Sequence, residues 1–450
     1  MSVTAGVKLP TTTGLVLSLD FQSKKSFVDA NATSLMSSAS WVAGTTGSTT
    51  GYTANETVGT ENARVNDTDP FGKTSVVWET RASSDSNADG GWNGDTYLTA
   101  DKTKLHRFSV WVRRTSSTSS GNFYLGLYTN GTGNVLRLSD SASETNPYWD
   151  YRATSLLVQN QWYLVVGHLF PTGYVGTTRH PDSGYYTIAS GPVKVSNNVG
   201  NIPDDAKFPT DATGVLQRCY HFYCTDNTTR LQFFDPRIDV CNGNQPTINE
   251  LLTRSPNVWY DNTRYGNHCV WNAKPTVSSK FFTFNGTSHY GTITNNSTLD
   301  FSNEQSIVMW MYPTGTTGRR NPWNQAYGGY GTWTDETTSN YINHYFGDTG
   351  IDSSPYANLS SATVNRNQWY MITMARNASV ARSYVNTTAG QAETAHAYGQ
   401  LATTSANILI GNGYAGFFEG RIGAVYAYNR YLSQTDVIQL FESTRYRYGV

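Results

Sequence analysis

Short alternations of apolar and polar residues run through most of the chain. Residues 15–21 place an apolar side chain at every second position, which predicts a strand with one buried face. Residues 162–170 are almost continuously apolar, as is typical of a strand buried on both faces. Similar runs predict further strands at 75–79, 108–113, 123–128, 218–224, 229–239, 281–284, 307–312, 341–346, 369–375, 380–385, 408–411 and 420–428.

Helical patterns are confined to two short segments. Residues 246–252 form one, and the other begins at Ser433, where Asp436 completes a capping pair ahead of an amphipathic stripe that reaches Phe441. The chain is therefore expected to be all-β, with a short helix at its carboxyl terminus.

One pattern occurs twice. A strand centred on Trp111 is followed by an Asn-Gln-Trp-Tyr segment at Trp162, and a strand centred on Trp310 is followed by the same segment at Trp369. The two tryptophans are separated by similar intervals in both copies. A repeat of this length predicts two domains of similar β architecture.

Composition narrows the classes of function. At 450 residues the chain can form two or three domains with separate cores. Only 14% of residues are charged and the net charge is −1, so we expect neither nucleic acid nor an anionic membrane as a partner. The chain holds 30 tyrosines, 12 tryptophans and 18 phenylalanines among many turn-forming residues, which is typical of β proteins.

The sequence also indicates where the protein resides. The first residues lack the apolar segment of a secretory signal, and no apolar run is long enough for a membrane-spanning helix. We expect synthesis in a cytoplasm, without membrane insertion, and the protein then either stays there or leaves by lysis or as part of a particle. The four cysteines are too few and too scattered for a disulfide framework and are expected to be reduced and buried.

Several segments carry a family resemblance. They are residues 14–20 (Gly-Leu-Val-Leu-Ser-Leu-Asp), 259–261 (Trp-Tyr-Asp), 284–286 (Phe-Asn-Gly), 321–332 and 420–425 (Gly-Arg-Ile-Gly-Ala-Val). They resemble the concanavalin A-like, laminin G-type jelly rolls of virion proteins in tailed phages, especially cyanophages. In such proteins the first two segments lie close together in sequence, whereas here a stretch long enough for a domain separates them. The resemblance therefore implies an inserted domain.

The inserted region resembles a carbohydrate-binding-module-like jelly roll that also occurs in phage proteins. Its matching segments are residues 107–112, 123–126, 161–167 and 233–237. The expected fold class is all-β, with two jelly-roll sandwiches, one inserted into the other. The expected parts are an amino-terminal arm at 1–12, a discontinuous laminin G-like domain at 13–26 plus 257–450, and the inserted domain at 27–256.

No catalytic constellation stands out. Phosphate-binding, nucleophile-elbow and zinc-protease motifs are missing from the sequence. A glycanase of this fold needs two nearby carboxylates. Asp335 and Glu336 are neighbours that would point to opposite faces of a strand, while Asp235 and Asp239 frame a Pro-Arg pair in a segment with a structural pattern. We therefore expect no enzymatic activity.

Two aromatic clusters are candidates for glycan binding, because sugars stack on exposed rings beside amide groups. The first is Trp323, Asn324, Tyr327, Tyr330 and Trp333, and the second is Tyr148, Trp149 and Tyr151. The alternative for the first cluster is a strand that enters the sheet, with its aromatic rings in the core and its glycines at a bulge.

Metal binding has one candidate. Asp348 and Asp352 flank Gly350 and could offer oxygen ligands to calcium, as rim residues of laminin G-like domains sometimes do. The alternative is a solvated turn. The histidines lack the spacing of metal ligands, and His221 and His344 are interpreted as structural. No cofactor is expected apart from this calcium candidate.

Three functions remain open. The first is a non-enzymatic virion protein, such as a fibre, tail appendage or head decoration, that oligomerises in an assembly with other virion proteins and also contacts host cell-surface polysaccharide. The second is a lectin or adhesin whose main task is glycan binding. The third is a polysaccharide-degrading enzyme, which the carboxylate pattern disfavours.

Overall fold

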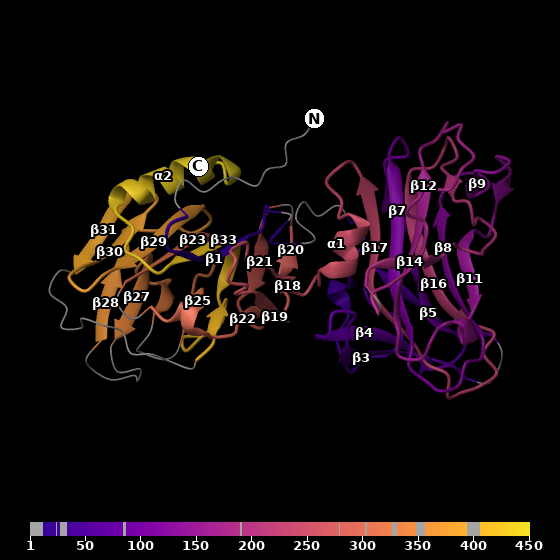
Figure 1. Ribbon diagram of the computed structural model, residues 1–450, viewed down its shortest axis with the longest axis horizontal. Coiled ribbons are helices and arrows are strands. Elements are labelled where there is room, and N and C mark those ends of the chain that lie inside the picture. The colour runs from indigo at the N-terminus through magenta and orange to yellow at the C-terminus, as the bar shows by residue number, and fades with distance from the viewer. Residues whose placement is uncertain are drawn as a thin grey trace. The chain divides into compact units, whose positions relative to one another are not determined.

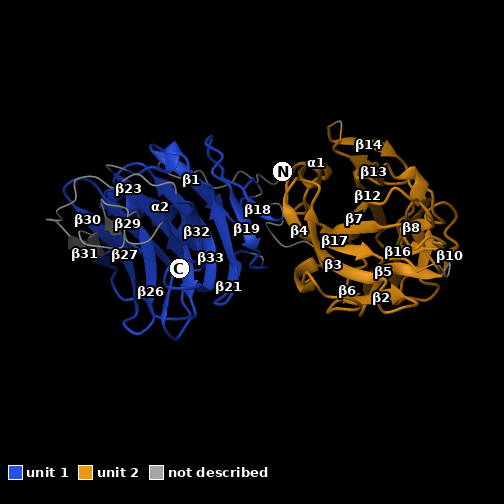
Figure 2. Cartoon of the chain, turned by 90° about the horizontal axis from the view of Figure 1, so that it is seen from below, with its two compact units in different colours: residues 1–31, 256–450 blue, residues 32–255 orange. Residues whose placement is uncertain are grey.

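The chain forms two compact units in the computed structural model (Figure 1, Figure 2). Unit 1 comprises residues 1–31 and 256–450, and unit 2 comprises residues 32–255. Both are β-sandwiches, which confirms the predicted fold class of two jelly rolls with one inserted into the other. The structure describes residues 12–23, 25–27, 34–83, 87–189, 191–278, 280–301, 304–325, 331–347, 356–393 and 406–450.

Unit 2 has two facing sheets. The first has the order β10-β9-β15-β12-β7-β17-β4-β3, with β13 also paired to β12 and β14 paired to β13. Its strands are β3 (Asn62–Thr68), β4 (Thr74–Thr80), β7 (Leu105–Arg114), β9 (Val135–Arg137), β10 (Ser143–Glu144), β12 (Trp162–Phe170), β13 (Gly184–Thr187), β14 (Val193–Ser196), β15 (Ala206–Lys207) and β17 (Leu231–Cys241).

The second sheet of unit 2 has the order β11-β8-β16-β5-β2, and β6 pairs with β16. Its strands are β2 (Tyr52–Glu56), β5 (Ala88–Gly94), β6 (Leu98–Thr99), β8 (Asn122–Thr129), β11 (Tyr148–Ala153) and β16 (Gly214–Phe222). The short helix α1 (Ile248–Thr253) ends the unit and begins with a capping box between Thr247 and Glu250.

Unit 1 also has two sheets. One has the order β20-β21-β33-β23-β29-β30-β31, with β1 beside β33, and the other has the order β18-β19-β22-β32-β25-β26-β27-β28, with β24 beside β26. The strands are β1 (Leu15–Asp20), β18 (Val258–Trp259), β19 (Cys269–Ala273), β20 (Thr276–Val277), β21 (Phe282–Asn285), β22 (Tyr290–Ile293), β23 (Gln305–Pro313), β24 (Arg319–Arg320), β25 (Trp323–Asn324), β26 (Thr332–Glu336), β27 (Tyr341–Gly347), β28 (Tyr356–Ser360), β29 (Tyr370–Arg376), β30 (Ala381–Val385), β31 (Thr388–Glu393), β32 (Ile408–Ile410) and β33 (Glu419–Tyr428).

Distant parts of the sequence meet in unit 1. Strand β1 pairs antiparallel with β33 near the carboxyl terminus. Asp261 accepts a hydrogen bond from the backbone amide of Ser18 at 2.8 Å, and the Asn267 amide donates to the carbonyl of Val16 at 2.8 Å. Each of these contacts joins a residue that precedes the inserted unit in the sequence to a residue that follows it. They explain why the Gly-Leu-Val-Leu strand and the Trp-Tyr-Asp turn belong to one domain.

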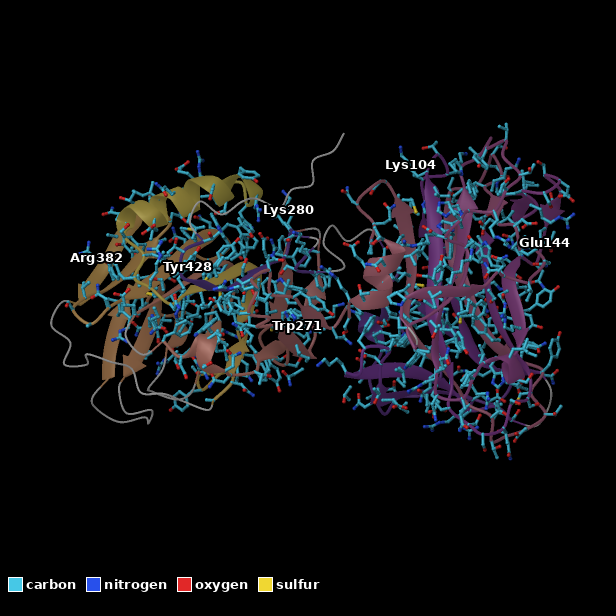
Figure 3. The ribbon with its side chains drawn as sticks, viewed as in Figure 1. Lys104, Glu144, Trp271, Lys280, Arg382 and Tyr428 are labelled. Carbon is cyan, nitrogen blue, oxygen red and sulfur yellow. The ribbon has the colours of Figure 1, made fainter. Side chains whose placement is uncertain are left out.

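Side chains fill the space between the two sheets of each unit (Figure 3). Helix α2 (Gln434–Thr444) covers the other face of the β23-β33 sheet, where its apolar residues pack against Trp310 and Tyr428. It begins with the predicted capping box between Ser433 and Asp436. Among the helices that the structure describes, none has the length and apolar character needed to cross a membrane.

The cysteines form no disulfide. Cys219, Cys224 and Cys269 are buried, and Cys241 is half-buried. Burial raises the pKa of each of these thiols, most strongly at Cys219 and Cys269, so they stay protonated at neutral pH. The prediction of burial is confirmed for three of the four cysteines.

Candidate functional site

The β11-β8-β16-β5-β2 sheet carries aromatic rings on the face that points away from its core. On β8, Phe123, Leu125 and Leu127 point inward and are fully buried. Because side chains alternate along a strand, Tyr124 and Tyr128 point outward, and both are partly exposed. Tyr124 and Tyr128, which were not among the predicted site residues, therefore belong to the outer face.

Strand β16 repeats the alternation beside β8. Cys219 lies in the core, whereas Arg218 and Tyr220 lie on the outer face. The chain leaves the strand at Phe222 and Tyr223, and Tyr223 is 54% exposed. We call the whole set the tyrosine face: Tyr124, Tyr128, Tyr148, Tyr151, Tyr220, Phe222 and Tyr223, with Arg218.

A β-bulge decides how the predicted Tyr148-Trp149-Tyr151 cluster is divided. Tyr148 pairs with Gly126, and Tyr151 pairs with Tyr124, but the register shifts between Tyr148 and Asp150. The extra residue lets Trp149 and Asp150 both turn into the unit, where they are fully buried, and returns Tyr151 to the outer face. Tyr148 and Tyr151 thus join the tyrosine face, whereas the expectation of an accessible Trp149 is wrong.

A glycine creates room in the middle of the face. Tyr148, Gly126, Arg218 and Asn93 form one row across four strands. A Cβ atom at Gly126 would lie 2.6 Å from the Tyr148 ring and 2.4 Å from the carbonyl oxygen of Pro147. Because glycine lacks this atom, the Tyr148 ring can lie over β8 and meet the guanidinium of Arg218 on the next strand.

Arg218 joins the rings into one surface. Its guanidinium carbon lies 3.9 Å from the ring centroid of Tyr128, 4.6 Å from that of Tyr148 and 5.1 Å from that of Tyr220. These are cation–π distances.

The Arg218 guanidinium also donates hydrogen bonds. Nη1 donates to Asn146 Oδ1 at 2.7 Å, and Nε donates to the Tyr220 hydroxyl at 2.9 Å and to Asn93 Oδ1 at 3.3 Å. Arg218 is buried, so its charge is screened from solvent by rings and amides.

The exposed end of the face is a cluster of neighbouring rings, which are tilted or edge-on to one another. Tyr151 is 42% exposed, and its ring centroid lies 6.0 Å from that of Tyr124. The Tyr223 centroid lies 6.4 Å from that of Tyr124 and 4.8 Å from that of Phe222. Burial raises the pKa of Tyr124, so its hydroxyl stays protonated at neutral pH and can donate a hydrogen bond.

The described residues of the first predicted cluster, Trp323, Asn324 and Trp333, are buried in unit 1. Trp323 in β25 and Trp333 in β26 are 0% exposed and lie in the unit 1 core, as the alternative interpretation of this segment required. Asn324 is buried as well and accepts a hydrogen bond from the Thr332 hydroxyl at 3.1 Å. The expectation that these side chains form an exposed sugar platform is wrong, because both indoles face the opposing sheet. Tyr327 and Tyr330 lie outside the described residues.

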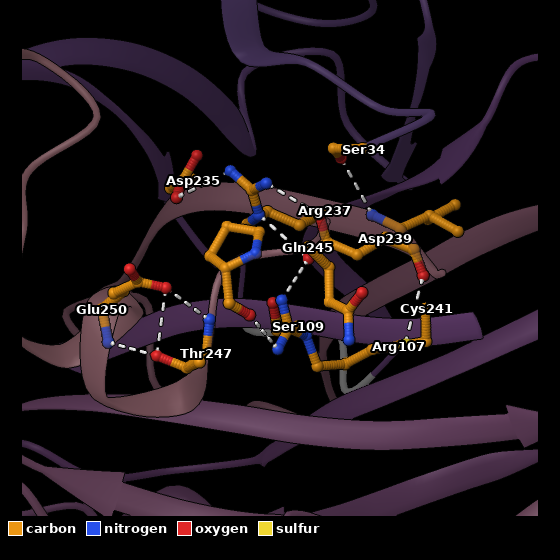
Figure 4. Close-up of polar contacts among 12 residues, drawn as sticks. Ser34, Arg107, Ser109, Asp235, Arg237, Asp239, Cys241, Gln245, Thr247 and Glu250 are labelled. Atoms are coloured by element: carbon orange, nitrogen blue, oxygen red, sulfur yellow. Dashed lines mark hydrogen bonds and ion pairs between the residues drawn. The ribbon is translucent and has the colours of Figure 1, made fainter. Parts of the chain in front are cut away.

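The carboxylates considered for catalysis form ion pairs. Asp239 lies between Arg107 and Arg237, with shortest oxygen to nitrogen distances of 2.7 Å to each (Figure 4). The two guanidinium groups hold the pKa of Asp239 well below its usual range despite its burial. Asp235 lies 3.8 Å from Arg237. This arrangement agrees with the structural interpretation of the segment.

The second carboxylate pair is divided in the same way. Buried Asp335 pairs with Arg366 at 2.5 Å, and Glu336 pairs with Arg319 at 2.9 Å. The two carboxylates are neighbours on β26, but each pairs with a different arginine, so they do not form a joint acid–base pair.

Within the described residues no group of three or more His, Cys, Asp or Glu side chains could hold a metal ion. The calcium candidates Asp348 and Asp352 lie outside those residues. His221 is buried, and its ring nitrogens lie 3.1 Å from the Thr80 hydroxyl and 3.0 Å from the carbonyl oxygen of Ser120. Burial lowers its pKa to about 4. These contacts agree with its structural interpretation.

Comparison with known proteins relates unit 1 to a family. Residues 285–438 match the sequence model of the laminin G type within the concanavalin A-like lectin/glucanases superfamily. This segment is therefore similar to concanavalin A-like domains. The match covers much of unit 1 and none of unit 2, which carries the tyrosine face. No curated protein matches the chain significantly.

Solved structures give further matches of low similarity. The binding domain of botulinum neurotoxin DC, in complex with rat synaptotagmin II, is 12% identical with a TM-score of 0.35, over 43% of this chain and 50% of that chain. The binding domain of Paraclostridial Mosquitocidal Protein 1 is 13% identical with a TM-score of 0.37, over 42% and 50%.

The ligand-binding domain of botulinum neurotoxin serotype D, in complex with N-acetylneuraminic acid, is 14% identical with a TM-score of 0.35, over 42% of this chain and 49% of that chain. The chain thus spans about half the length of these structures. At this identity and TM-score, the ligands of those proteins say nothing about a ligand of this chain.

Proposed function

We propose that this chain is a non-enzymatic glycan-binding protein and that the tyrosine face of unit 2 is its binding site. The observation that carries the proposal is the cluster of neighbouring, partly exposed rings of Tyr124, Tyr151 and Tyr223 at one end of a sheet face. Sugars present flat C–H surfaces that stack on such rings, and hydroxyl groups that bond to phenols and amides. Asn93 and Asn146 supply amides at the same face.

The rigidity of the face supports the proposal. All the rings except that of Tyr223, which directly follows β16, lie on three hydrogen-bonded strands, and the Arg218 guanidinium contacts three of these rings. A surface that is already ordered loses little conformational entropy when a ligand binds. Tyrosine adds to this advantage because its side chain has few rotatable bonds.

The contacts of the candidate acids support a binding role without hydrolysis. A glycosidase requires one carboxyl group that can donate a proton and a second that acts as base or nucleophile. Asp239 and Asp335 are instead buried in ion pairs with arginine. Incubation of the protein with host envelope polysaccharide is expected to release no oligosaccharide. Release of defined oligosaccharides would contradict the non-enzymatic part of the proposal.

A glycan array tests the site. The wild-type protein is expected to bind a restricted set of glycans, and Tyr124→Ala combined with Tyr151→Ala is expected to abolish binding. Tyr446→Ala is the matched control, because Tyr446 is 64% exposed in unit 1. If the double variant keeps full binding, the tyrosine face is not the site.

We place this activity in the virion of a tailed phage, as part of a fibre, tail appendage or head decoration. The laminin G-like and carbohydrate-binding-module-like segments resemble phage virion proteins and support this placement. The low charge and abundant tyrosine of the chain suit contacts with other virion proteins. Mass spectrometry of purified particles is expected to detect the protein in a fixed number of copies. Its absence from the particles would contradict the placement.

A further inference from the structure

The tyrosine face extends along its strands. Tyr124 and Tyr128 lie four residues apart on β8 and point to the same side, which separates them by about 13 Å. Tyr151 and Tyr223 lie near the Tyr124 end. Tyr148 lies between the two ends and is more deeply buried. A surface with rings at both ends and a floor between them fits a chain of sugars better than a single sugar.

The outer face of β8, β11 and β16 presents no carboxylate, and the structure describes all three strands. Asp150, the acidic residue on β11, turns inward at the bulge. There it accepts hydrogen bonds from the Tyr185 hydroxyl at 3.1 Å and from the backbone amide of Val199 at 3.0 Å. Arg152 also leaves the face, because its guanidinium stacks on the Tyr185 ring at 4.0 Å.

The guanidinium of Arg218, the cation on this face, already has partners within the protein. Arg218 makes three ring contacts and donates hydrogen bonds to Asn146, Tyr220 and Asn93. An anionic ligand would have to replace these bonds in order to reach the guanidinium. Burying a carboxylate without a cationic partner is costly, whereas a sugar hydroxyl can bond to phenols and amides.

We propose that the ligand of the tyrosine face is a neutral oligosaccharide, at least three sugars long, that lies along β8 and β16. Its C–H surfaces stack on the rings of Tyr124, Tyr151 and Tyr128. Its hydroxyl groups bond to the phenols and to the amides at the border of the face. Acidic glycans, such as polyuronates and sialylated chains, are excluded. This inference rests on the proposed function and specifies its ligand class.

Calorimetric titration of the full-length protein tests the inference. The probes are neutral malto-, cello- and manno-oligosaccharides, from disaccharide to hexasaccharide, and oligogalacturonates and oligoalginates of equal length. Affinity for one neutral series is expected to rise up to the trisaccharide or beyond and to stay unchanged between low and high salt, because no ion pair forms. Oligouronates are expected not to bind.

Three variants locate the binding. Tyr124→Ala and Tyr151→Ala are each expected to weaken neutral binding by about tenfold or more, which corresponds to about 1.4 kcal/mol. Tyr446→Ala is expected to leave it unchanged. Thermal unfolding of each variant verifies the fold, so that a lost ring can be distinguished from a lost domain.

The outcomes separate the inference from the proposed function. Salt-sensitive binding of oligouronates that disappears in Tyr124→Ala overturns the neutral-ligand inference and leaves the glycan site in place. Binding limited to a monosaccharide overturns the extended arrangement. If neither series binds, or if binding persists in both tyrosine variants, the proposed site fails and the inference fails with it.

Discussion

The Asp20 carboxylate and the Arg447 guanidinium form a buried ion pair with an oxygen to nitrogen distance of 2.6 Å. The pair joins the first strand of unit 1 to the end of the chain. Asp20 raises the pKa of Arg447 further, so the guanidinium stays charged under all ordinary conditions. Asp20 Oδ2 also accepts a hydrogen bond from the Tyr426 hydroxyl at 3.4 Å. Unit 1 is thus closed by groups from both ends of the chain.

Substitution of Arg447 should therefore destabilise unit 1. Arg447→Ala leaves a buried carboxylate without its cation, which typically costs about 3–5 kcal/mol. The expected result is a lower urea midpoint for the unfolding of unit 1. Arg445→Ala is the control, because its ion pair with Glu442 is exposed and contributes about 0–1 kcal/mol. Equal effects of the two substitutions would contradict the role of the buried pair.

Gly126 should control the shape of the tyrosine face. In Gly126→Ala the new methyl group would collide with the Pro147 carbonyl oxygen and the Tyr148 ring, and β11 would have to move away from β8. Overpacking of this kind costs about 1–3 kcal/mol, and glycan affinity should fall with it. Gly59→Ala is the control, since nothing lies within 4 Å of a Cβ atom there. Thermal unfolding and glycan titration measure both effects, and unchanged affinity in Gly126→Ala would argue against this packing.

Trp323→Ala and Tyr151→Ala should behave in opposite ways. Removal of the buried indole in unit 1 is expected to cost about 3–5 kcal/mol of stability without a change in glycan affinity. Removal of the exposed phenol in unit 2 is expected to change stability by about 0.5 kcal/mol or less and to weaken binding. Chemical denaturation and calorimetry on both variants give the comparison. Lost binding in a stable Trp323→Ala protein would restore the first predicted cluster as a site.

The buried Asp205 carboxyl should make the stability of unit 2 depend on pH. Its oxygens accept hydrogen bonds from the backbone amides of His168 and His180, and Ser183 Oγ lies 2.8 and 2.9 Å from them. Burial nevertheless raises the pKa of Asp205 to about 7.

A carboxyl group with a raised pKa binds its proton more tightly in the folded state. Its contribution to stability is therefore complete below its unfolded pKa and is lost as the pH rises through about 7. The free energy of unfolding of the wild type, relative to Asp205→Asn, is expected to fall by up to about 4 kcal/mol between about pH 4 and about pH 8. Denaturant unfolding at several pH values measures it, and a constant difference would refute the assignment.

The fold was predictable because its signals are local. The alternation at residues 15–20 and the continuous apolar run at 162–170 each specify a strand without knowledge of the rest of the chain. The Ser433–Asp436 capping box is also contained in four residues. The insertion became visible through a family pattern that the intervening unit interrupts.

The site was less predictable because it depends on how strands pair. Trp149 and Tyr151 would share a face in a regular strand, and only the bulge opposite β8 separates them. Arg218 meets Tyr128 and Tyr148 through strands that are far apart in sequence. The alternation in residues 122–128 and 218–222 does place aromatic side chains opposite the core-facing residues. That signal could have identified Tyr124, Tyr128 and Tyr220, but not Tyr223, which is exposed because the chain leaves the strand there.

Protection of individual tyrosines tests the central claim most directly, because it locates the glycan on the unmodified protein. Phenol groups are acetylated with N-acetylimidazole, with and without the saturating oligosaccharide, and the modified residues are identified by mass spectrometry. The prediction is slower modification of Tyr151 and Tyr223 in the complex, with unchanged rates at the exposed Tyr414 and Tyr446 of unit 1. Unchanged rates at Tyr151 and Tyr223, with protection in unit 1 instead, would contradict it.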